Sequence, residues 1–361
     1  MHYVGLDVHA HQSTYCVLDG NGKVFQRRTV FGSWHKLIGK LDKMPKPFAV
    51  CYEASLGYGF LYDRLSKIAE RVEVANTSQL RLIFRSKHKN DRADAEKLAK
   101  LLFIDQVPVI HVPKPEIRAW RSIIEHRHSL VSERTRIKNG LRAILRSRAI
   151  VPPMRLWTKA GITWLAGIDL DSDLDALRRD MLLERLCSVE KMVARVEKTL
   201  DARGTAHPGV RLLMTIPGVG LRTAEAVMAY IDEPGRFTRN KAVGRYFGLV
   251  PTQDASSRKN HLGHITKEGS PTVRKLLVEA AWQGKRRSRR IKAFYERILR
   301  DDKQRKKIAI VATAHYILRC MLAMLTTGEV WRNRGTDKIY SPPQRLRRVI
   351  DKPILAAVAG N

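Results

Sequence analysis

Apolar and polar positions alternate through the first thirty residues with the two-residue period of β-strands. Residues 1–9 carry apolar side chains at alternate positions, so Asp7 faces away from the apolar side. Two further strand-like runs, 13–18 and 23–30, flank the sequence Asp-Gly-Asn-Gly, which is typical of a tight hairpin turn. The pattern therefore predicts three strands, of which the last two form a hairpin.

The following segments change between the helical and the strand period. Helical spacing covers residues 33–41, 58–69 and 91–102, and strand-like runs cover residues 47–53 and 72–75. Three strands, a helix and then strands and helices in turn is the order of the ribonuclease H-like fold, which RuvC-type nucleases share. We therefore predict an α/β domain of RuvC-like type at residues 1–113.

Long helical patterns follow. Residues 115–149 and 174–200 are charged and helical, and we expect them to pack as a hairpin or coiled coil, or against another subunit. Their basic faces either are solvated or lie along a duplex. Residues 308–327 are apolar enough to raise the question of a membrane span, but they contain His315 and Arg319 between basic flanks, which favours a buried helix.

The net charge of the chain limits the classes of molecule that it is expected to bind. The formal net charge is +32 and the pI is about 10.4, so the chain attracts polyanions, of which nucleic acid is the expected one. An anionic membrane is the alternative, but no lipidation motif or amphipathic anchor supports it. The four cysteines are far apart, which argues against a zinc finger or a disulfide framework and fits a reducing cytoplasm. No signal peptide is evident.

Four carboxylates are candidates for a metal site. Asp7 lies on the first strand, Glu53 ends a later one, and Asp91 and Asp94 are neighbours on one helix. Gathered carboxylates suit Mg²⁺, and two such ions form the usual clamp for displacement at phosphorus. The alternatives are that Asp91 and Asp94 stabilise a helix N-terminus and that the other two acids are solvated or pair with arginines.

A second candidate is the turn Ile216-Pro217-Gly218-Val219-Gly220, which precedes a helix at residues 223–230. The turn would expose backbone N–H groups that bind phosphate without reading sequence, as in helix-hairpin-helix elements. Gly218 and Gly220 are the residues concerned. The alternative is a turn that only joins two packed helices.

A third candidate is a polar loop predicted over residues 246–269, in which two adjacent serines stand among cations. A serine hydroxyl is a poor nucleophile unless a base or a metal activates it, and neighbouring cations could hold phosphate oxygens. The alternative is an ordinary solvated loop. The loop and the densely basic helical stretch that follows supply the candidate nucleic-acid contacts Arg258, Lys259, Lys267, Arg286, Arg287, Arg289 and Arg290.

The chain resembles the DEDD transposases of the insertion sequence 110 family, which are RNA-guided recombinases of bacterial mobile elements. The resemblance covers roughly residues 1–330, and its pieces stand in the family's order. They are Gly5-Leu6-Asp7-Val8-His9, Tyr52-Glu53-Ala54, Asn90-Asp91-Arg92-Ala93-Asp94-Ala95, Ile216-Pro217-Gly218-Val219-Gly220, Gly248-Leu249-Val250-Pro251, the Ser256 segment, Ile265-Thr266-Lys267-Glu268-Gly269 and Leu276-Leu277.

The resemblance implies roles for these residues. The acids Asp7, Glu53, Asp91 and Asp94 match the metal-binding set of a RuvC-like domain, which holds Mg²⁺ (or Mn²⁺). Ser256 occupies the position of the nucleophilic serine, and Ser257 stands where the family usually has glycine. The implied reaction passes through a covalent phosphoseryl-DNA intermediate, which preserves the bond energy for rejoining.

The resemblance also implies partners. A structured guide RNA, the bridge RNA, would pair with donor and target DNA, so that base pairing selects sequence while protein charge holds backbones. Family members assemble as homodimers and tetramers in which the RuvC-like domain of one protomer meets the serine domain of another. We expect assembly through the long helices at residues 114–205, a mainly helical transposase domain at 206–330, a basic tail at 331–361, and no membrane.

Two other functions remain open. One is a RuvC-type, structure-specific DNA nuclease that uses metal-activated water, and the other is a non-catalytic nucleic-acid-binding protein.

Overall fold

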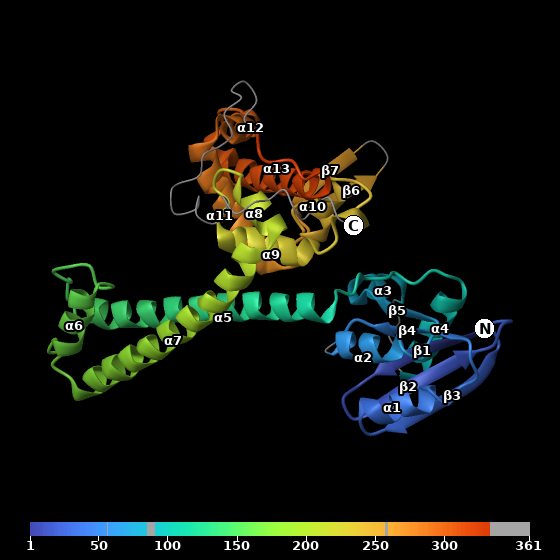
Figure 1. The fold of residues 1–361 in the computed structure, drawn as a ribbon. Helices are drawn as coiled ribbons and strands as arrows, with labels where there is room; N and C mark the ends of the chain where they lie inside the picture. Colours follow the sequence, from blue (N-terminus) through green and yellow to red (C-terminus); the bar gives the residue numbers. More distant parts are fainter. Residues whose placement is uncertain (56, 85–90, 257–258, 333–361) are drawn as a thin grey trace. The chain divides into compact units, whose positions relative to one another are not determined.

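The computed structural model describes residues 1–55, 57–84, 91–256 and 259–332 (Figure 1). The side chains of residues 91–92, 254–256 and 259–260 are outside that description. The chain divides into two compact units, which meet in sequence at Pro115 and Glu116. The first is mixed α/β and the second is largely helical, as the sequence predicts.

A five-stranded mixed sheet forms the first unit, in the spatial order β3-β2-β1-β4-β5. The strands are β1 (His2–Val8), β2 (Gln12–Leu18), β3 (Val24–Phe31), β4 (Phe48–Glu53) and β5 (Arg71–Ala75). β2 is antiparallel to β1 and β3, which confirms the predicted hairpin, whereas β4 is parallel to both β1 and β5. The sheet therefore sets the carboxyl ends of β1, β4 and β5 along one edge.

Helices cover both faces of this sheet, because its central strands carry apolar side chains on both faces. Helices α1 (Trp34–Leu41) and α2 (Tyr58–Leu65) cover one face, where Leu37 of α1 and Leu61 of α2 share a core with the strand residues Val4, Leu6 and Val50. Helix α4 (Asp91–Phe103) lies on the other face, over Cys16, Leu18, Ala49 and Cys51. The short helix α3 (Thr77–Ile83), which the pattern does not predict, follows β5.

Two long helices open the second unit and confirm the predicted helical hairpin. Helices α5 (Pro115–Ser147) and α7 (Asp173–Ala206) pack through a shared apolar core that includes Leu130, Ile137, Leu141, Leu186, Val189 and Val193. The ion pairs Arg127–Glu197, Lys138–Glu190 and Arg148–Asp175 fix the two helices as antiparallel. The short helix α6 (Lys159–Gly167) lies at the closed end of this hairpin (Figure 1).

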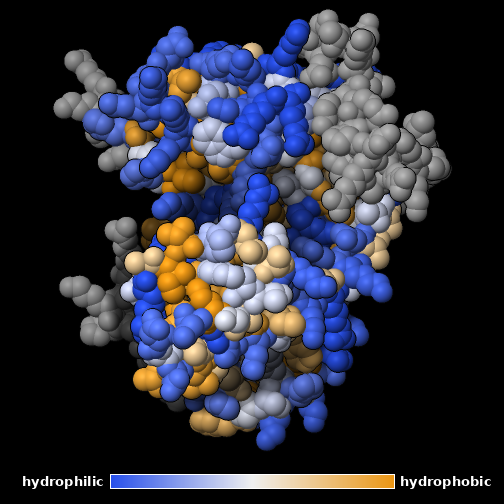
Figure 2. Space-filling model, turned by 90° about the vertical axis from the view of Figure 1, so that its left-hand side faces the viewer, coloured by the Kyte–Doolittle hydropathy of each residue, from blue (hydrophilic) through white to orange (hydrophobic). Residues whose placement is uncertain are grey.

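Apolar side chains remain exposed at that end. Leu174, Leu177 and Met181 lie three and four residues apart at the start of α7 and are 58–79% exposed. In Figure 2, where the α6 end of the hairpin faces the viewer, orange hydrophobic residues stand in patches among blue hydrophilic ones. This surface is more apolar than the charged pattern of the two helices suggests.

The remainder of the second unit is a helical body. It contains α8 (Pro208–Met214), α9 (Leu221–Ile231), α10 (Ala242–Tyr246), α11 (Pro271–Arg287), α12 (Arg289–Leu299) and α13 (Lys306–Thr327), with short 3-10 turns at Pro234–Arg236 and Lys303–Arg305. The stretch Lys303–Thr327 is long and apolar enough to cross a membrane by length and composition. Its residues Ile317, Leu318 and Met321 are fully buried in the body, which agrees with the predicted core helix.

One prediction for this body is wrong. The segment expected to be a polar loop forms an antiparallel pair of strands, β6 (Pro251–Ser256) and β7 (Lys259–Ile265). The pattern hides these strands because polar residues predominate in their sequence, and the apolar Leu262 and Ile265 are three residues apart, so no two-residue alternation marks them. Figure 1 shows the pair extending from the helical body.

Candidate functional site

The sheet register brings two of the predicted acids to one edge. In the parallel pair of β1 and β4, Gly5 lies opposite Cys51 and Leu6 opposite Tyr52. The next step of the same register sets Asp7 at the level of Glu53, at the carboxyl end of both strands. Cys51 packs under α4, and side chains alternate along a strand, so Glu53 lies on the α4 face.

Helix α4 delivers the other two acids to the same edge. A Cβ on Gly5 would stand 2.1 Å from the carbonyl oxygen of Ala95, so the helix crosses β1 at this glycine. Farther along α4, the ring of Phe103 meets that of Tyr3 at 5.2 Å. The helix thus runs antiparallel to β1, and its first turn, with Asp91 and Asp94, lies toward the end of the strand that carries Asp7.

Two of these acids, Asp7 and Asp94, have local partners. Asp7 Oδ2 lies 3.3 Å from Nε2 of His9, and Lys97 Nζ donates to Asp94 Oδ1 at 2.9 Å. The Asp91 side chain is outside the described part of the chain. Among the side chains that the structure describes, no group of three His, Cys, Asp or Glu residues is arranged to hold a metal ion.

The donor set nevertheless fits a hard divalent cation. All four groups are carboxylates, which are the oxygen ligands that Mg²⁺ and Mn²⁺ prefer, and the backbone brings them to one edge. To coordinate an ion, Asp94 would have to give up its ion pair with Lys97. That ion pair is weak because both side chains are partly exposed. Sequence reasoning gave His9 no role, although its position two residues after Asp7 predicts the same strand face.

The serine candidate ends a strand. Ser256 is the last residue of β6, and its backbone pairs with that of Lys259, the first residue of β7. Their side chains, and all of Ser257 and Arg258, lie outside the described residues. Lys267, farther along, is exposed, has φ +57°, and donates its backbone N–H to the carbonyl of Gly248 at 3.2 Å.

Two glycines allow a close backbone approach at the base of β6 and β7. Gly248 has φ +65°, and a Cβ there would stand 2.2 Å from the amide nitrogen of Glu268. Gly269 has φ +66°, and its Cβ would stand 2.3 Å from the carbonyl oxygen of Tyr246. No other residue fits this junction without moving backbone, so the family motifs around Gly248 and Gly269 have a packing reason.

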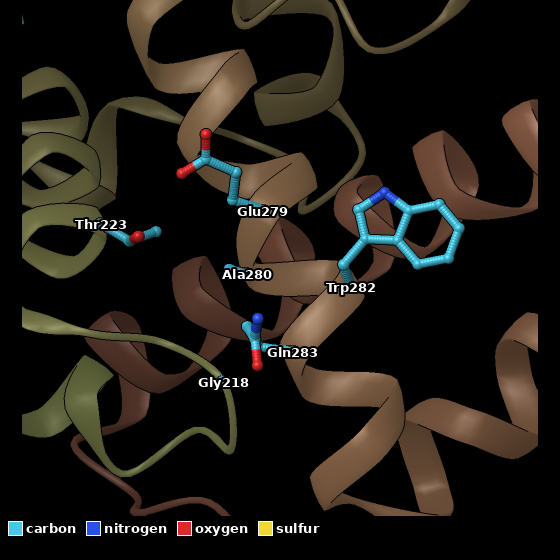
Figure 3. A pocket seen from close by; sticks show the side chains of 6 residues that line it. All are labelled: Gly218, Thr223, Glu279, Ala280, Trp282 and Gln283. Carbon is cyan, nitrogen blue, oxygen red and sulfur yellow. The ribbon is translucent and has the colours of Figure 1, made fainter. Parts of the chain in front are cut away.

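The Pro-Gly-Val-Gly turn packs on α11. Gly218 has φ +95°, and a Cβ there would meet the backbone nitrogen of Gly284 at 2.4 Å. Gly220 precedes the first turn of α9 and has open space around it, so it alone of the pair leaves room for a phosphate. A cavity of about 470 Å³ adjoins the turn and is lined by Gly218, Thr223, Glu279, Ala280, Trp282 and Gln283 (Figure 3). The Glu279 carboxylate disfavours an anion inside it.

The predicted basic residues lie where α11 meets α12. Arg286, Arg287 and Arg289 are exposed, whereas Arg290 is half-buried and stacks over the rings of Tyr316 and Trp331. Burial, and then the neighbouring cations Arg286, Lys306 and Lys292, lower the pKa of Lys285. The cations around Lys285 also form a positive surface, which is what polyanion binding requires.

Comparisons with known proteins match two parts of the chain to transposase families. A family model of DEDD transposases of the IS110 type, described as "Transposase", matches residues 4–149, and a model described as "Transposase IS116/IS110/IS902 family" matches residues 210–296. The first range contains all four acids, and the second contains Ser256, both turn glycines and the basic residues.

Individual relatives carry the same description. The chain is 26% identical to the transposase for insertion sequence element IS1111A of Coxiella burnetii, over 77% of this chain and 76% of the relative. It is 25% identical to the transposase for insertion sequence element IS1328 of Yersinia enterocolitica, over 65% and 70%. It is 23% identical to the transposase for insertion sequence element IS1533 of Leptospira borgpetersenii, over 78% and 84%.

Proposed function

Because the chain belongs to the IS110 family of insertion sequence transposases, enzymes that cut and rejoin DNA, we propose that it does so through a covalent bond between DNA and Ser256. The proposal further assigns Asp7, Glu53, Asp91 and Asp94 to a metal site of RuvC-like type. The supporting observation is the register of β1 and β4, which with α4 brings these acids to one edge of the sheet.

The serine step needs no external energy source. The Ser256 Oγ–H attacks a DNA phosphorus, an Oγ–P bond forms, and the bond from phosphorus to one strand oxygen breaks. The hydroxyl proton leaves Oγ, and the departing strand oxygen takes up a proton. Attack by a strand hydroxyl on the phosphoserine reverses these changes and rejoins DNA. The phosphodiester energy is therefore conserved.

Each group of residues has a separate task in this reaction. The four carboxylates would hold Mg²⁺ or Mn²⁺, which supplies Lewis-acid stabilisation of charge on phosphate oxygens. Arg258 and Lys259 follow the serine closely in sequence and would orient the phosphate by charge, whereas Lys267, at the base of β6 and β7, would contact a nucleic-acid backbone farther from the serine. Gly220 and the cations Arg286, Arg287 and Arg289 would bind nucleic-acid phosphates at positions distant from the reacting phosphorus. Such contacts position the nucleic acid without reading its sequence.

Sequence choice would come from a guide RNA. A net charge of +32 exceeds what one DNA duplex contact needs, and it suits a protein that holds donor DNA, target DNA and a structured RNA at once. We propose that the chain acts as a homo-oligomer in the bacterial cytoplasm, with the α5–α7 hairpin in its assembly.

The experiment is a covalent trapping assay. The full chain, with the RNA that copurifies, is incubated with Mg²⁺ and a labelled duplex bearing the flanks of its own gene, and then denatured. We expect labelled protein that survives denaturation from wild type and Ser257→Ala, and none from Ser256→Ala or Asp7→Asn. Cleavage by Ser256→Ala without any adduct would instead identify a water-using nuclease. Binding without strand breakage in any sample would identify a non-catalytic binder.

A further inference from the structure

The strands β6 and β7 join the helical body through a narrow root, defined here as residues 247–250 and 266–270. The strands pair with each other, and their described outer side chains, Thr252, Gln253, His261 and Leu262, are exposed. A pair of strands on its own is marginally stable in water. The direction in which β6 presents its last residue, Ser256, therefore depends on what fixes the root.

Arg274, in the first turn of α11, binds both sides of this root. Its Nη1 donates to the carbonyl oxygen of Phe247 at 3.3 Å and to that of Gly269 at 3.1 Å, and it also contacts the carbonyl oxygen of Glu268. Phe247 precedes β6, whereas Glu268 and Gly269 follow β7. One guanidinium nitrogen, which carries two N–H groups, thus ties the incoming chain to the outgoing chain through shared hydrogen bonds.

Glu125, on α5, fixes the helix that carries Arg274. Its carboxylate accepts hydrogen bonds from the hydroxyls of Tyr230 at 2.6 Å, Ser270 at 2.9 Å and Thr272 at 2.6 Å. Ser270 is both the last residue of the root and the N-cap of α11, where its Oγ accepts from the backbone N–H of Val273 at 3.3 Å. One carboxylate therefore holds the residue at which the hairpin ends and the helix begins.

In the folded protein, the carboxylate of Glu125 is ionised near neutral pH. Burial by itself would raise its pKa, but the hydrogen bonds from Thr272, Tyr230 and Ser270 outweigh burial and hold the pKa of Glu125 below its ordinary value. Hydrogen bonds to a charged acceptor are about twice as strong as neutral ones. The network therefore consists of charge-assisted hydrogen bonds, and it lies on described residues of the second unit alone.

We propose that Glu125 and Arg274 are positioning residues for Ser256: together they set the angle at which the β6–β7 hairpin leaves the body and so aim its serine. Neither residue touches DNA in this role. The inference rests on the proposed function, since it gives the hairpin a catalytic purpose. A shift of about 1 Å in a reacting group can cost about 100-fold in rate, so a loosened root is expected to affect the reaction strongly.

The test measures two quantities on the full chain. The first is the rate of covalent adduct formation in the trapping assay at saturating DNA, beside DNA affinity. The second is amide hydrogen exchange in the free protein at Thr266 and Lys267, whose N–H groups bond to Val250 and Gly248 across the root. The variants are Glu125→Ala, Glu125→Gln and Arg274→Gln. The controls are Glu184→Gln and Lys275→Gln, which remove exposed charges from α7 and α11.

We expect Glu125→Ala and Arg274→Gln to slow adduct formation by about 100-fold with DNA affinity unchanged. Glu125→Gln, whose amide oxygen still accepts hydrogen bonds, should recover most of that rate. In Glu125→Ala and Arg274→Gln, the amide hydrogens of Thr266 and Lys267 should exchange faster than in wild type, while those of α13 keep the wild-type rate. The controls should match wild type in every measurement.

Two results would overturn the proposal: root amides and adduct rates that stay at wild-type values, or adduct rates that fall only in proportion to DNA affinity. A wild-type chain that forms no adduct would refute the serine chemistry. In that case the exchange of the root amides still decides whether Glu125 and Arg274 fix the hairpin.

Discussion

A single Cβ atom added at Gly5 would displace α4, and with it Asp91 and Asp94. In Gly5→Ala the new Cβ would stand 2.1 Å from the carbonyl oxygen of Ala95 and 2.4 Å from the amide nitrogen of Ala99. Both are backbone atoms of one helix, so no side-chain rotation relieves the overlap. The helix must move away from β1 by about 1 Å or more to reach van der Waals contact, which empties part of the core.

The expected cost follows from overpacking. Inserting a methyl group into a filled interior costs about 1–3 kcal/mol, and a value near the upper end is expected because backbone is displaced. Since the chain has two units, a single melting temperature is not well defined, and amide hydrogen exchange of β1 and α4 is the suitable assay. A loss of about 2 kcal/mol would speed exchange through global opening about thirtyfold.

A matched glycine gives the control. A Cβ on Gly39, inside α1, would meet no atom within 4 Å, so Gly39→Ala should stabilise its helix by about 0.5–1 kcal/mol. Gly5→Ala should also weaken Mg²⁺-dependent trapping, because Asp91 and Asp94 move with α4. Exchange in Gly5→Ala as slow as in wild type would refute the close crossing of α4 over β1, and with it the gathering of the acids at that edge.

The sequence predicts the first unit well because its elements alternate apolar and polar positions clearly. It does not predict α3, which has seven residues and too few turns for periodicity, although the Asn76 side chain caps it by accepting from the N–H of Ser78 and Gln79. It does not predict β6 and β7, whose ladder is set by backbone pairing rather than by burial.

The candidate sites divide in the same way. Strand period places Asp7 and Glu53, whereas no local pattern shows that Glu125 meets hydroxyls about a hundred residues or more away in sequence. The sequence signal for Glu125 is its position one residue after the buried Ile124, because a carboxylate beside the buried stripe of a helix needs hydrogen-bond partners. Long-range hydrogen bonds of this kind depend on tertiary structure.

Two further predictions concern charge. Burial raises the pKa of Glu225 to about 8 despite the neighbouring Arg222, so the folded state binds this proton more tightly than the unfolded chain does. Stability should therefore fall as pH rises from about 4.5 to 8, and Glu225→Gln should reduce that fall in urea titrations; equal pH dependence in both proteins would contradict it. Replacing Arg286, Arg287 and Arg289 by Gln should reduce the slope of log affinity against log salt for duplex DNA by about 0.9 for each cation that contacts phosphate. The exposed Lys40→Gln should leave the slope unchanged, and an unaltered slope in the triple variant would exclude this surface from DNA binding.

Mass spectrometry of the trapped protein tests the central claim most directly. After covalent trapping and nuclease digestion, the peptide spanning residues 251–265 should carry a nucleotide phosphate on Ser256, only when Mg²⁺ or Mn²⁺ is present and only when Asp7 is intact. A nucleotide on Ser257, a modification that forms equally in the presence of a chelator, or complete strand exchange with an unmodified peptide would contradict the account.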